Sequence, residues 1–169
     1  MNIEYKCIEG KKDSLGMPCY ESQHDTVVVS TDASRTDMDF VERSLKLSYW
    51  AGTRPKELVR RTWSHSLQFG IYEQSSGTQI AMMRVLTDYG HYAHCFDVWV
   101  DPEHRGKGYS KLLMSFYMNY PELKDVNRFQ LTTSDAHTLY GQYGFAQLKE
   151  PEKFMEMKRH VVFKPSVAK

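Results

Sequence analysis

The stretch His104-Arg105-Gly106-Lys107-Gly108-Tyr109-Ser110 lies between two segments of different periodicity. Residues 92–100 (YAHCFDVWV) before it have the pattern of a strand, which ends at an Asp-Pro pair. In residues 109–119 after it, apolar side chains recur on one helix face. A glycine-rich turn that opens a helix presents unpaired N–H groups and the positive end of the helix dipole to an anion. The stretch therefore predicts either an anion-binding loop or an ordinary left-handed turn with solvated cations.

The common nucleotide-binding motifs do not fit this loop. The pattern G-x-x-x-x-G-K-[ST] is absent, because Gly-Tyr-Ser-Lys at 108–111 has the wrong order and spacing. The pattern G-x-G-x-x-G also fails, because Gly106-Lys107-Gly108 is followed by Tyr109, Ser110 and Lys111. Neither a P-loop nor a dinucleotide fingerprint is therefore expected.

Outward from this loop, strand and helix patterns alternate along the chain. Three strand patterns on short turns predict an antiparallel meander at residues 67–72, 79–87 and 92–100. Helices are expected before the meander at residues 36–50 and 55–65, and short strands near the start at 3–8 and 26–30, separated by a polar loop. After the loop helix we expect a strand at 129–132, a short helix at 135–143 closed by Gly144, and strands at 145–148 and 154–158.

This order of elements predicts an α/β fold of the α+β type with a mixed sheet. The chain has 169 residues and a mass of 19.8 kDa, which is the size of one domain. No linker divides it. We therefore expect residues 1–169 to form a single domain, in which 1–34 are an N-terminal extension with one or two short strands and 36–160 are the core.

Composition narrows the class of protein. The chain has 22 Lys and Arg against 21 Asp and Glu, a formal net charge of +1 that does not favour a nucleic-acid partner. The longest apolar runs are far shorter than the ~20 residues that cross a bilayer, and the first residues lack a signal peptide pattern, so no membrane partner is expected. Three cysteines without a C-x-x-C pair favour neither a disulfide framework nor a zinc site. These features predict a cytoplasmic protein with reduced thiols and no metal.

A second motif lies about 25 residues after the loop, in Thr133-Ser134-Asp135-Ala136-His137-Thr138-Leu139-Tyr140-Gly141-Gln142-Tyr143-Gly144-Phe145. Together the two motifs resemble the GNAT superfamily of N-acetyltransferases, in the family patterns Q/R-x-x-G-x-G/A and N-x-x-A-x-x-[LF]-Y-x-x-x-G-F. Ser110 replaces the last small residue of the first pattern, and Thr133 replaces the leading Asn of the second. The D-A-H-x-L-Y-x-x-x-G-F form is similar to a subgroup of small bacterial and fungal members. The resemblance covers about residues 38–158.

The resemblance implies a GNAT fold with a mixed central sheet of about six or seven strands, splayed at the cofactor site and flanked by about four helices. It implies an acetyl-CoA-dependent N-acetyltransferase that moves an acetyl group directly to a primary amine of a small molecule, without a metal. An alternative is a non-catalytic protein of the same fold that binds acyl-CoA as a sensor or partner. The chain would act as a monomer or as a homodimer formed through edge strands at 3–8 or 154–158.

The resemblance also implies where coenzyme A binds. The main chain at the end of the strand before the loop would pair with the pantetheine arm, and the N–H groups of the loop would hold the pyrophosphate. Thr133 stands where many members have an Asn that contacts the coenzyme A arm, and its hydroxyl is expected to replace part of that contact. The residues expected to bind the cofactor are Val98, Trp99, Val100, Arg105, Gly106, Lys107, Gly108, Tyr109, Ser110 and Thr133.

Transfer to an amine needs proton movement, because a primary amine with a pKa near about 10 must lose a proton to attack. The resemblance gives Tyr140 the role of the acid that protonates the leaving thiolate, whereas packing in the core is the alternative. His94 and Asp97 are both candidates for the base. A regular strand would place His94 on the face of Val98 and Val100, and Asp97 on the opposite face unless a bulge turns it.

The acceptor is expected between the two early helices and the middle strands. Aromatic side chains gather there and predict a cleft for an aromatic or cationic amine, although core packing explains each of them equally well. The residues expected to contact the acceptor are Tyr49, Trp50, Arg54, Tyr89 and Tyr92.

Overall fold

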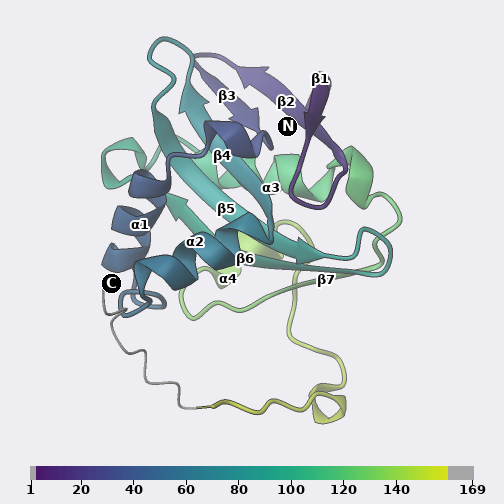
Figure 1. The fold of residues 1–169 in the computed structure, drawn as a ribbon. Helices are drawn as coiled ribbons and strands as arrows, with labels where there is room; N and C mark the ends of the chain where they lie inside the picture. The colour runs from purple at the N-terminus through teal and green to yellow at the C-terminus, as the bar shows by residue number, and fades with distance from the viewer. Residues whose placement is uncertain (1–2, 160–169) are drawn as a thin grey trace.

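The computed structural model describes residues 3–159 and contains one seven-stranded mixed sheet (Figure 1). The strands follow one another across the sheet in chain order, from β1 to β7. All neighbouring strands are antiparallel except β6 and β7, which are parallel. The bounds are β1 Lys6–Lys12, β2 Pro18–His24, β3 Val27–Ser30, β4 Leu67–Glu73, β5 Gln79–Thr87, β6 Tyr92–Val100 and β7 Arg128–Leu131. The predicted fold class and strand number are confirmed.

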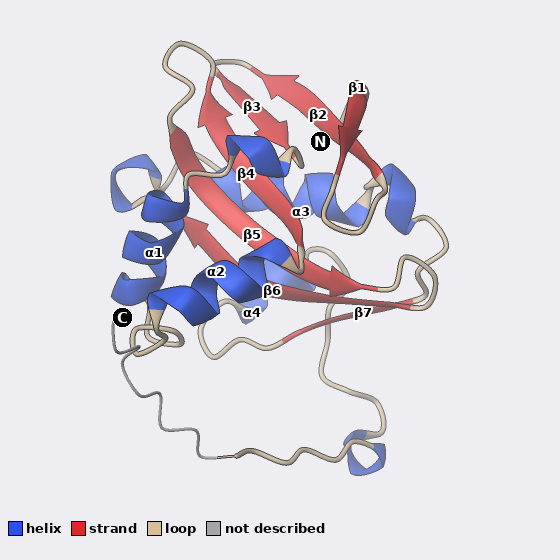
Figure 2. Cartoon of the chain, in the orientation of Figure 1, coloured by secondary structure: helices blue, strands red, loops and turns tan. Residues whose placement is uncertain are grey.

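Helices cover both faces of the sheet (Figure 2). On one face lie α1 (Met38–Leu47) and α2 (Lys56–Ser64), whose buried side chains form a small core with Met82 of β5. On the other face lies α3 (Tyr109–Met118), which buries Leu113 and Phe116 in the main core. The short helix α4 (His137–Gly141) follows β7, and its Tyr140 joins the main core.

The parallel pair of strands explains the position of α3. Two parallel neighbours cannot be joined by a tight turn, so the chain crosses over the sheet from β6 to β7 through a helix. This crossover places the glycine loop of residues 104–108 at the end of β6 and directly before α3. Gly108 is the N-cap of α3, with a left-handed φ of +84°.

The N-terminal extension contains three strands rather than one or two. Residues 9–23 were expected to form a polar loop, but Pro18–His24 form β2 between β1 and β3. The prediction was wrong because pairing on both sides, rather than apolar alternation, makes this segment a strand. Only Cys19 and Ser22 of β2 are buried. The extension continues the same sheet as the rest of the chain.

The two strands expected at residues 145–148 and 154–158 are absent from the structure. After α4 the described chain has only one 3-10 turn, η4 (Pro151–Lys153). The alternating pattern of this segment is real, but no neighbouring strand lies beside it to complete its hydrogen bonds. The helix predicted at 135–143 is also shorter: it spans His137–Gly141, because the residues before it form a turn in which the Ala136 N–H bonds the Thr133 hydroxyl. Gly144, with a φ of +85°, follows in the turn after the helix.

Gly70 in the middle of β4 provides a test of the packing of the sheet. A Cβ atom at this position would lie 2.7 Å from Cε2 of Tyr72, whose ring is only 1% exposed. Overpacking of this kind costs about 1–3 kcal/mol. We expect Gly70→Ala to lower the free energy of unfolding by that amount in urea titrations. Gly90→Ala, where the nearest atom is 3.9 Å away, is the control, and equal stability of the two variants would contradict this packing.

Candidate functional site

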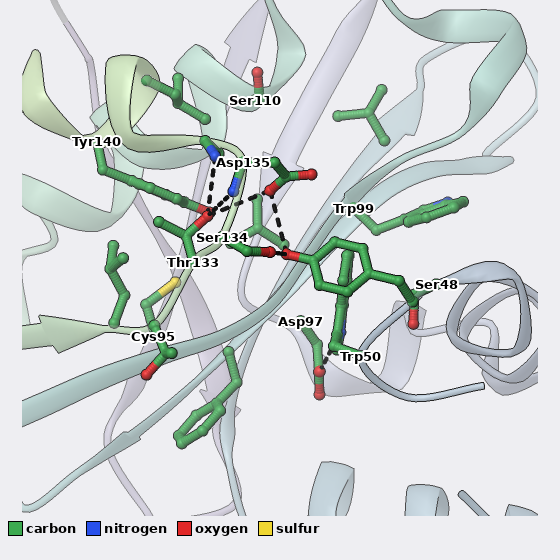
Figure 3. Close-up of a pocket in the computed structure, with 18 of the residues that line it drawn as sticks. Ser48, Trp50, Cys95, Asp97, Trp99, Ser110, Thr133, Ser134, Asp135 and Tyr140 are labelled. Atoms are coloured by element: carbon green, nitrogen blue, oxygen red, sulfur yellow. Dashed lines mark hydrogen bonds between the residues drawn. The ribbon is translucent and has the colours of Figure 1, made fainter. Parts of the chain in front are cut away.

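A cleft of about 990 Å³ opens where β6 passes into the glycine loop. Its walls come from the loop between α1 and α2, the end of β6, the start of α3, and the segment from β7 to α4. Figure 3 shows Trp50, Asp97 and Trp99 on one side of this space and Tyr140 and Thr133 on the other. The predicted site residues that line the cleft are Tyr49, Trp50, Arg54, Asp97, Val98, Trp99, Val100, Arg105, Gly106, Gly108, Tyr109, Ser110, Thr133 and Tyr140.

The cleft exists because two strands of the sheet separate. The pairing of β6 with β7 ends at Cys95 and Leu131, although β6 continues to Val100. Beyond Cys95, the edge of β6 that faces β7 therefore has no strand beside it in the described chain. Its main-chain N–H and C=O groups are available to an extended ligand, as the groups of an edge strand are.

A β-bulge at Asp97 turns the end of β6. The register between β5 and β6 shifts between Met82 and Arg84, so that Asp97 and Val98 together lie opposite Met83. Asp97 has a φ of +56°, which is uncommon for a residue other than glycine. The extra residue reverses the alternation of side chains from this point to the end of the strand.

The predicted grouping of the β6 side chains is therefore wrong. Register pairs place His94 and Phe96 on the face that carries α1 and α2, and after the bulge Trp99 occupies that same face. Val98 and Val100 pack against the main core on the other face. His94 thus does not share a face with Val98 and Val100, because the bulge lies between them.

The glycine loop has the geometry of an anion site. Gly106 and Gly108 both have left-handed backbones, with φ values of +78° and +84°. No side chain caps the first turn of α3, so its N–H groups have no side-chain acceptor in the described chain, and residues 108–110 of this turn line the cleft. Arg105 is anchored beside them, because its Nε donates to the Val100 carbonyl at 3.1 Å and its guanidinium stacks on Trp99. Lys107 is exposed and does not line the cleft.

Tyr140 reaches the cleft from α4. Its side chain is 9% exposed, and no residue in 3–159 hydrogen-bonds its hydroxyl. Burial raises the pKa of this hydroxyl above its ordinary value. The group therefore keeps its proton at neutral pH and can donate it to a ligand in the cleft.

Thr133 stabilises the turn that precedes α4. Its hydroxyl accepts a hydrogen bond from the Ala136 N–H at 3.0 Å, which supports the turn that leads into α4. A contact with the cofactor would therefore compete with this bond.

Asp97 is the centre of a buried hydrogen-bond network. Its carboxylate is 1% exposed and accepts bonds from Arg84 Nε at 2.7 Å, Arg54 Nη1 at 3.1 Å and Trp50 Nε1 at 3.0 Å. Trp50 and Arg54 belong to the loop between α1 and α2, whereas Arg84 belongs to β5. The carboxylate therefore ties this loop to the sheet. Because both of its oxygens already accept two bonds, it is a positioning group rather than a free base.

Aromatic rings form the wall of the cleft next to the loop between α1 and α2. Trp50 packs edge-on against both Tyr49 and Trp99, with ring centroids 4.9 Å and 6.1 Å apart. The Tyr49 hydroxyl crosses to the opposite wall, where it donates to Asp135 at 3.2 Å and accepts a bond from Ser134 at 2.6 Å. The hydroxyl of Tyr49 thus bridges the two walls of the cleft.

Besides Lys107, three predicted residues lie outside the cleft. Tyr89 and Tyr92 stand at the turn between β5 and β6, where the Tyr89 hydroxyl donates to Asp13 and the Tyr92 hydroxyl to Gln130. This turn is at the opposite end of β6 from the cleft, because each strand residue advances the chain by about 3.3 Å. His94 stacks on Phe96 at 4.2 Å, and its ring also does not line the cleft. The assignment of Tyr89 and Tyr92 to the acceptor pocket is therefore corrected.

The sequence reasoning missed several residues of the cleft. Ser134 and Asp135 are part of the second motif and were recognisable as neighbours of Thr133. Cys95 and Phe96 line the cleft where β7 leaves β6, which no local pattern indicates. Glu156 and Lys158 also contribute, from the segment that was expected to be a strand. Within residues 3–159 there is no cluster of side chains suited to hold a metal ion, and no helix long and apolar enough to cross a membrane.

His94 provides a pH test of the structure. Its Nδ1 contacts the Tyr92 hydroxyl at 2.9 Å, whereas its buried Nε2 has no partner in the described chain. Burial, assisted by the Arg84 guanidinium, lowers the pKa of His94. The unfolded chain therefore binds more protons than the folded one below about pH 6.5, and the free energy of unfolding decreases as the pH falls.

We expect His94→Gln to reduce this decrease when urea unfolding is compared at pH 7 and pH 5. His24, whose pKa burial also lowers, contributes part of the slope that remains. His137→Gln, at an exposed position on α4, is the matched control. A slope that is unchanged in His94→Gln would show that this ring titrates equally in both states.

Comparison with known proteins agrees with this geometry. The family model for the acetyltransferase (GNAT) domain matches residues 65–147. A protein from Xanthomonas campestris pv. campestris assigned to the GNAT family has a crystal structure with 45% identity and a TM-score of 0.75, covering 82% of this chain and 96% of its own. An acetyltransferase candidate from Gibberella zeae is 26% identical over 68% of this chain and 76% of its own length.

One more distant structure contains the cofactor. It comes from Clostridium acetobutylicum, was solved with acetyl-CoA, and superimposes with a TM-score of 0.56 at 16% identity over 73% of this chain and 92% of its own. At that identity it shows only the shared fold. The closely similar Xanthomonas protein and the family match show more, and this chain belongs to the GNAT superfamily of N-acetyltransferases.

Proposed function

We propose that the protein transfers the acetyl group of acetyl-CoA directly to a primary amine of a small molecule. The observation that carries this proposal is the meeting, in one cleft, of the glycine loop at the start of α3, the free edge of β6 and the hydroxyl of Tyr140. These groups match the three parts of the cofactor that must be held or moved: the pyrophosphate, the pantetheine arm and the leaving thiolate.

The cofactor is held mainly by backbone groups. The pyrophosphate would accept hydrogen bonds from the N–H groups of Gly106 to Ser110, where the helix dipole favours negative charge. The pantetheine arm would lie along β6 beyond Cys95 and pair with the main chain of Val98 and Val100. The acetyl group would then lie between the bulge and Tyr140. Acetyl-CoA is the co-substrate, and the chemistry it supplies when bound is an activated thioester.

The chain's own groups then move protons. The neutral amine attacks the thioester carbonyl carbon, a C–N bond forms, and the C–S bond breaks as the tetrahedral adduct collapses. Tyr140 donates its proton to the departing sulfur. The amine loses its proton to water at the open mouth of the cleft, because Asp97 is fully engaged and His94 lies outside. Tyr140 regains a proton from the same solvent.

The acceptor side favours an amine with a flat apolar body. The rings of Tyr49, Trp50 and Trp99 provide its wall. Arg54 uses only Nη1 to bind Asp97, so the other two nitrogens of its guanidinium have no partner within residues 3–159 and can bind a carboxylate of the acceptor. The free cysteines Cys7, Cys19 and Cys95 match a reducing compartment, and we place the reaction in the cytoplasm.

The experiment that tests this function follows release of the free thiol of coenzyme A. Purified protein is incubated with acetyl-CoA and a panel in which each arylalkylamine is paired with its α-carboxylate counterpart. Turnover with any amine supports the enzyme, and the ratio within each pair reports on Arg54. Tight binding of acetyl-CoA without turnover on the whole panel would support the alternative, a sensor that binds acyl-CoA.

Removal of the Tyr140 hydroxyl tests the acid. We expect Tyr140→Phe to lower the turnover number by about 10²–10⁴ and to leave the affinity for acetyl-CoA unchanged. The control is Tyr143→Phe, which removes a hydroxyl that donates to the Lys111 carbonyl outside the cleft. Because the pKa of Tyr140 is raised, the wild-type rate should not fall through its ionisation below about pH 10. A Tyr140→Phe variant with half the normal rate would assign this residue to packing.

A negative charge introduced at Gly108 tests whether the glycine loop binds the pyrophosphate. Asp and Asn both tolerate a left-handed backbone and have similar shapes, so Gly108→Asp and Gly108→Asn differ mainly in charge. We expect Gly108→Asp to weaken acetyl-CoA binding by at least tenfold, about 1.4 kcal/mol, in calorimetric titrations. Gly108→Asn should lose less affinity, because it adds bulk without repelling the pyrophosphate. Equal affinity of the Asp variant and the wild type would move the cofactor to another site.

A further inference from the structure

The inner end of the cleft is the place where β6 and β7 come together. The last register pair before the strands separate joins Cys95 to Leu131. Residues directly opposite each other in neighbouring strands point to the same face, and both of these side chains pack on the main core that α3 covers. Both also line the cleft, together with Leu139 and Tyr140 of α4. These four side chains form a floor, largely apolar, at which the cleft meets the main core.

Cys95 is the most deeply buried side chain of this floor. It is 4% exposed, whereas Tyr140 is 9% exposed and the two leucines are only partly buried. Figure 3 shows the sulfur of Cys95 pointing from β6 toward Thr133 and Tyr140. Burial raises the pKa of the Cys95 thiol, so the thiol keeps its proton at neutral pH. Because the thiolate is the nucleophilic form, this side chain can lie beside a thioester as a packing group without taking its acetyl group.

The proposed path of the cofactor ends at this floor. The pyrophosphate would lie at the glycine loop, which follows Val100, and the pantetheine arm would pair first with Val100 and then with Val98. The arm therefore runs along β6 toward Cys95, against the direction of the chain. Its free end meets the pair of Cys95 and Leu131, where β7 occupies the place beside β6. The acyl group at the end of the arm is thus the part of the donor that faces the floor.

The two faces of the sheet leave the alkyl end of the acyl group one direction. In the proposed reaction the amine approaches from the aromatic wall of Trp50 and Trp99, on the face that carries α1 and α2. Cys95 points to the opposite face. An alkyl chain directed at the aromatic wall would stand between the amine and the carbonyl carbon, so a reactive acyl group directs its alkyl end to the floor. Because protein interiors are close-packed, the distance to the floor limits the number of carbons.

We propose that Cys95 selects the acyl group of the donor: with Leu131, Leu139 and Tyr140 it forms a floor that admits acetyl and excludes propionyl and butyryl groups. The inference rests on the proposed function, since it takes the same cleft as the site of the donor thioester. It adds the residue that chooses the donor, which contacts the alkyl end and takes part in no covalent step. One methylene in an apolar pocket changes discrimination by about 10–200-fold, which is enough to separate acetyl-CoA from its longer analogues.

The first experiment compares donors without any acceptor. Calorimetric titrations with coenzyme A, acetyl-CoA, propionyl-CoA and butyryl-CoA give four dissociation constants. We expect butyryl-CoA to bind the wild type at least about tenfold more weakly than acetyl-CoA. Cys95→Ala removes the sulfur from the floor, so the ratio of these two dissociation constants should fall toward one. Cys19→Ala is the matched control, because it makes the same change at a fully buried cysteine of β2 outside the cleft, and it should keep the wild-type ratio.

A larger side chain at the same position should act in the opposite direction. Cys95→Val introduces a residue that suits a strand and fills the space beside the thioester. We expect it to weaken acetyl-CoA by about tenfold or more relative to free coenzyme A, whose arm ends before the floor. Circular dichroism checks the fold of this variant, and the ratio in Cys95→Ala decides the question where Cys95→Val does not fold.

The outcomes separate this proposal from the proposed function. Equal affinity of the wild type for acetyl-CoA and butyryl-CoA, or a wild-type ratio in Cys95→Ala, would overturn the role of Cys95 and leave the acetyltransferase function in place. Failure of all four compounds to bind the wild type would overturn both. A ratio that falls in Cys19→Ala as much as in Cys95→Ala would show that loss of any buried thiol loosens the cleft, and would also overturn the proposal.

Discussion

The carboxylate of Asp97 is the interaction on which both halves of the cleft depend. Its residue forms the bulge that turns the end of β6, and its left-handed backbone is uncommon for a residue other than glycine. Three donors surround the carboxylate, two of them guanidinium groups, and hold it in that position. Loss of one of these donors would leave one oxygen of the buried carboxylate with fewer hydrogen bonds, which is unfavourable in a low-dielectric interior. The bulge therefore persists because the network around it is complete.

The same network connects the loop between α1 and α2 to the sheet, so the two walls of the cleft keep fixed positions relative to each other. Arg84 fixes the carboxylate to the middle of the sheet, whereas Trp50 and Arg54 fix it to the loop between α1 and α2. The bulge sets the direction of Val98 and Val100, whose main chain would meet the cofactor. The loop sets the aromatic wall for the acceptor. In the proposed reaction, a change in the position of this single side chain would therefore move the thioester and the amine relative to each other, and near-attack geometry tolerates little of that movement.

The features that depend on neighbouring residues could be predicted from the sequence, whereas strand pairing between distant segments could not. The glycine loop, α3 and the turn at Gly144 were recognisable because glycine conformation and helix periodicity are properties of neighbouring residues. The face of His94 was predicted wrongly because the bulge arises from contacts of Asp97 with Arg54 and Arg84, which are distant in sequence. A strand exists only where a partner completes its hydrogen bonds, and the sequence of one segment does not show whether a partner is present. For this reason the prediction missed β2, which has partners on both sides, and wrongly included strands at 145–148 and 154–158, which have none.

The half of the cleft proposed for coenzyme A and the half proposed for the acceptor are built from different kinds of groups. Backbone N–H and C=O groups face the expected path of coenzyme A, and they depend on glycine conformations and on the separation of β6 from β7. The acceptor wall consists of side chains that hold one another, as Tyr49 does with Ser134 and Asp135. Backbone sites bind a constant ligand irrespective of most side chains, whereas a wall of side chains is reshaped by single substitutions. This division explains why the motifs identify the cofactor readily, while the acceptor must be identified from the side chains of this one cleft.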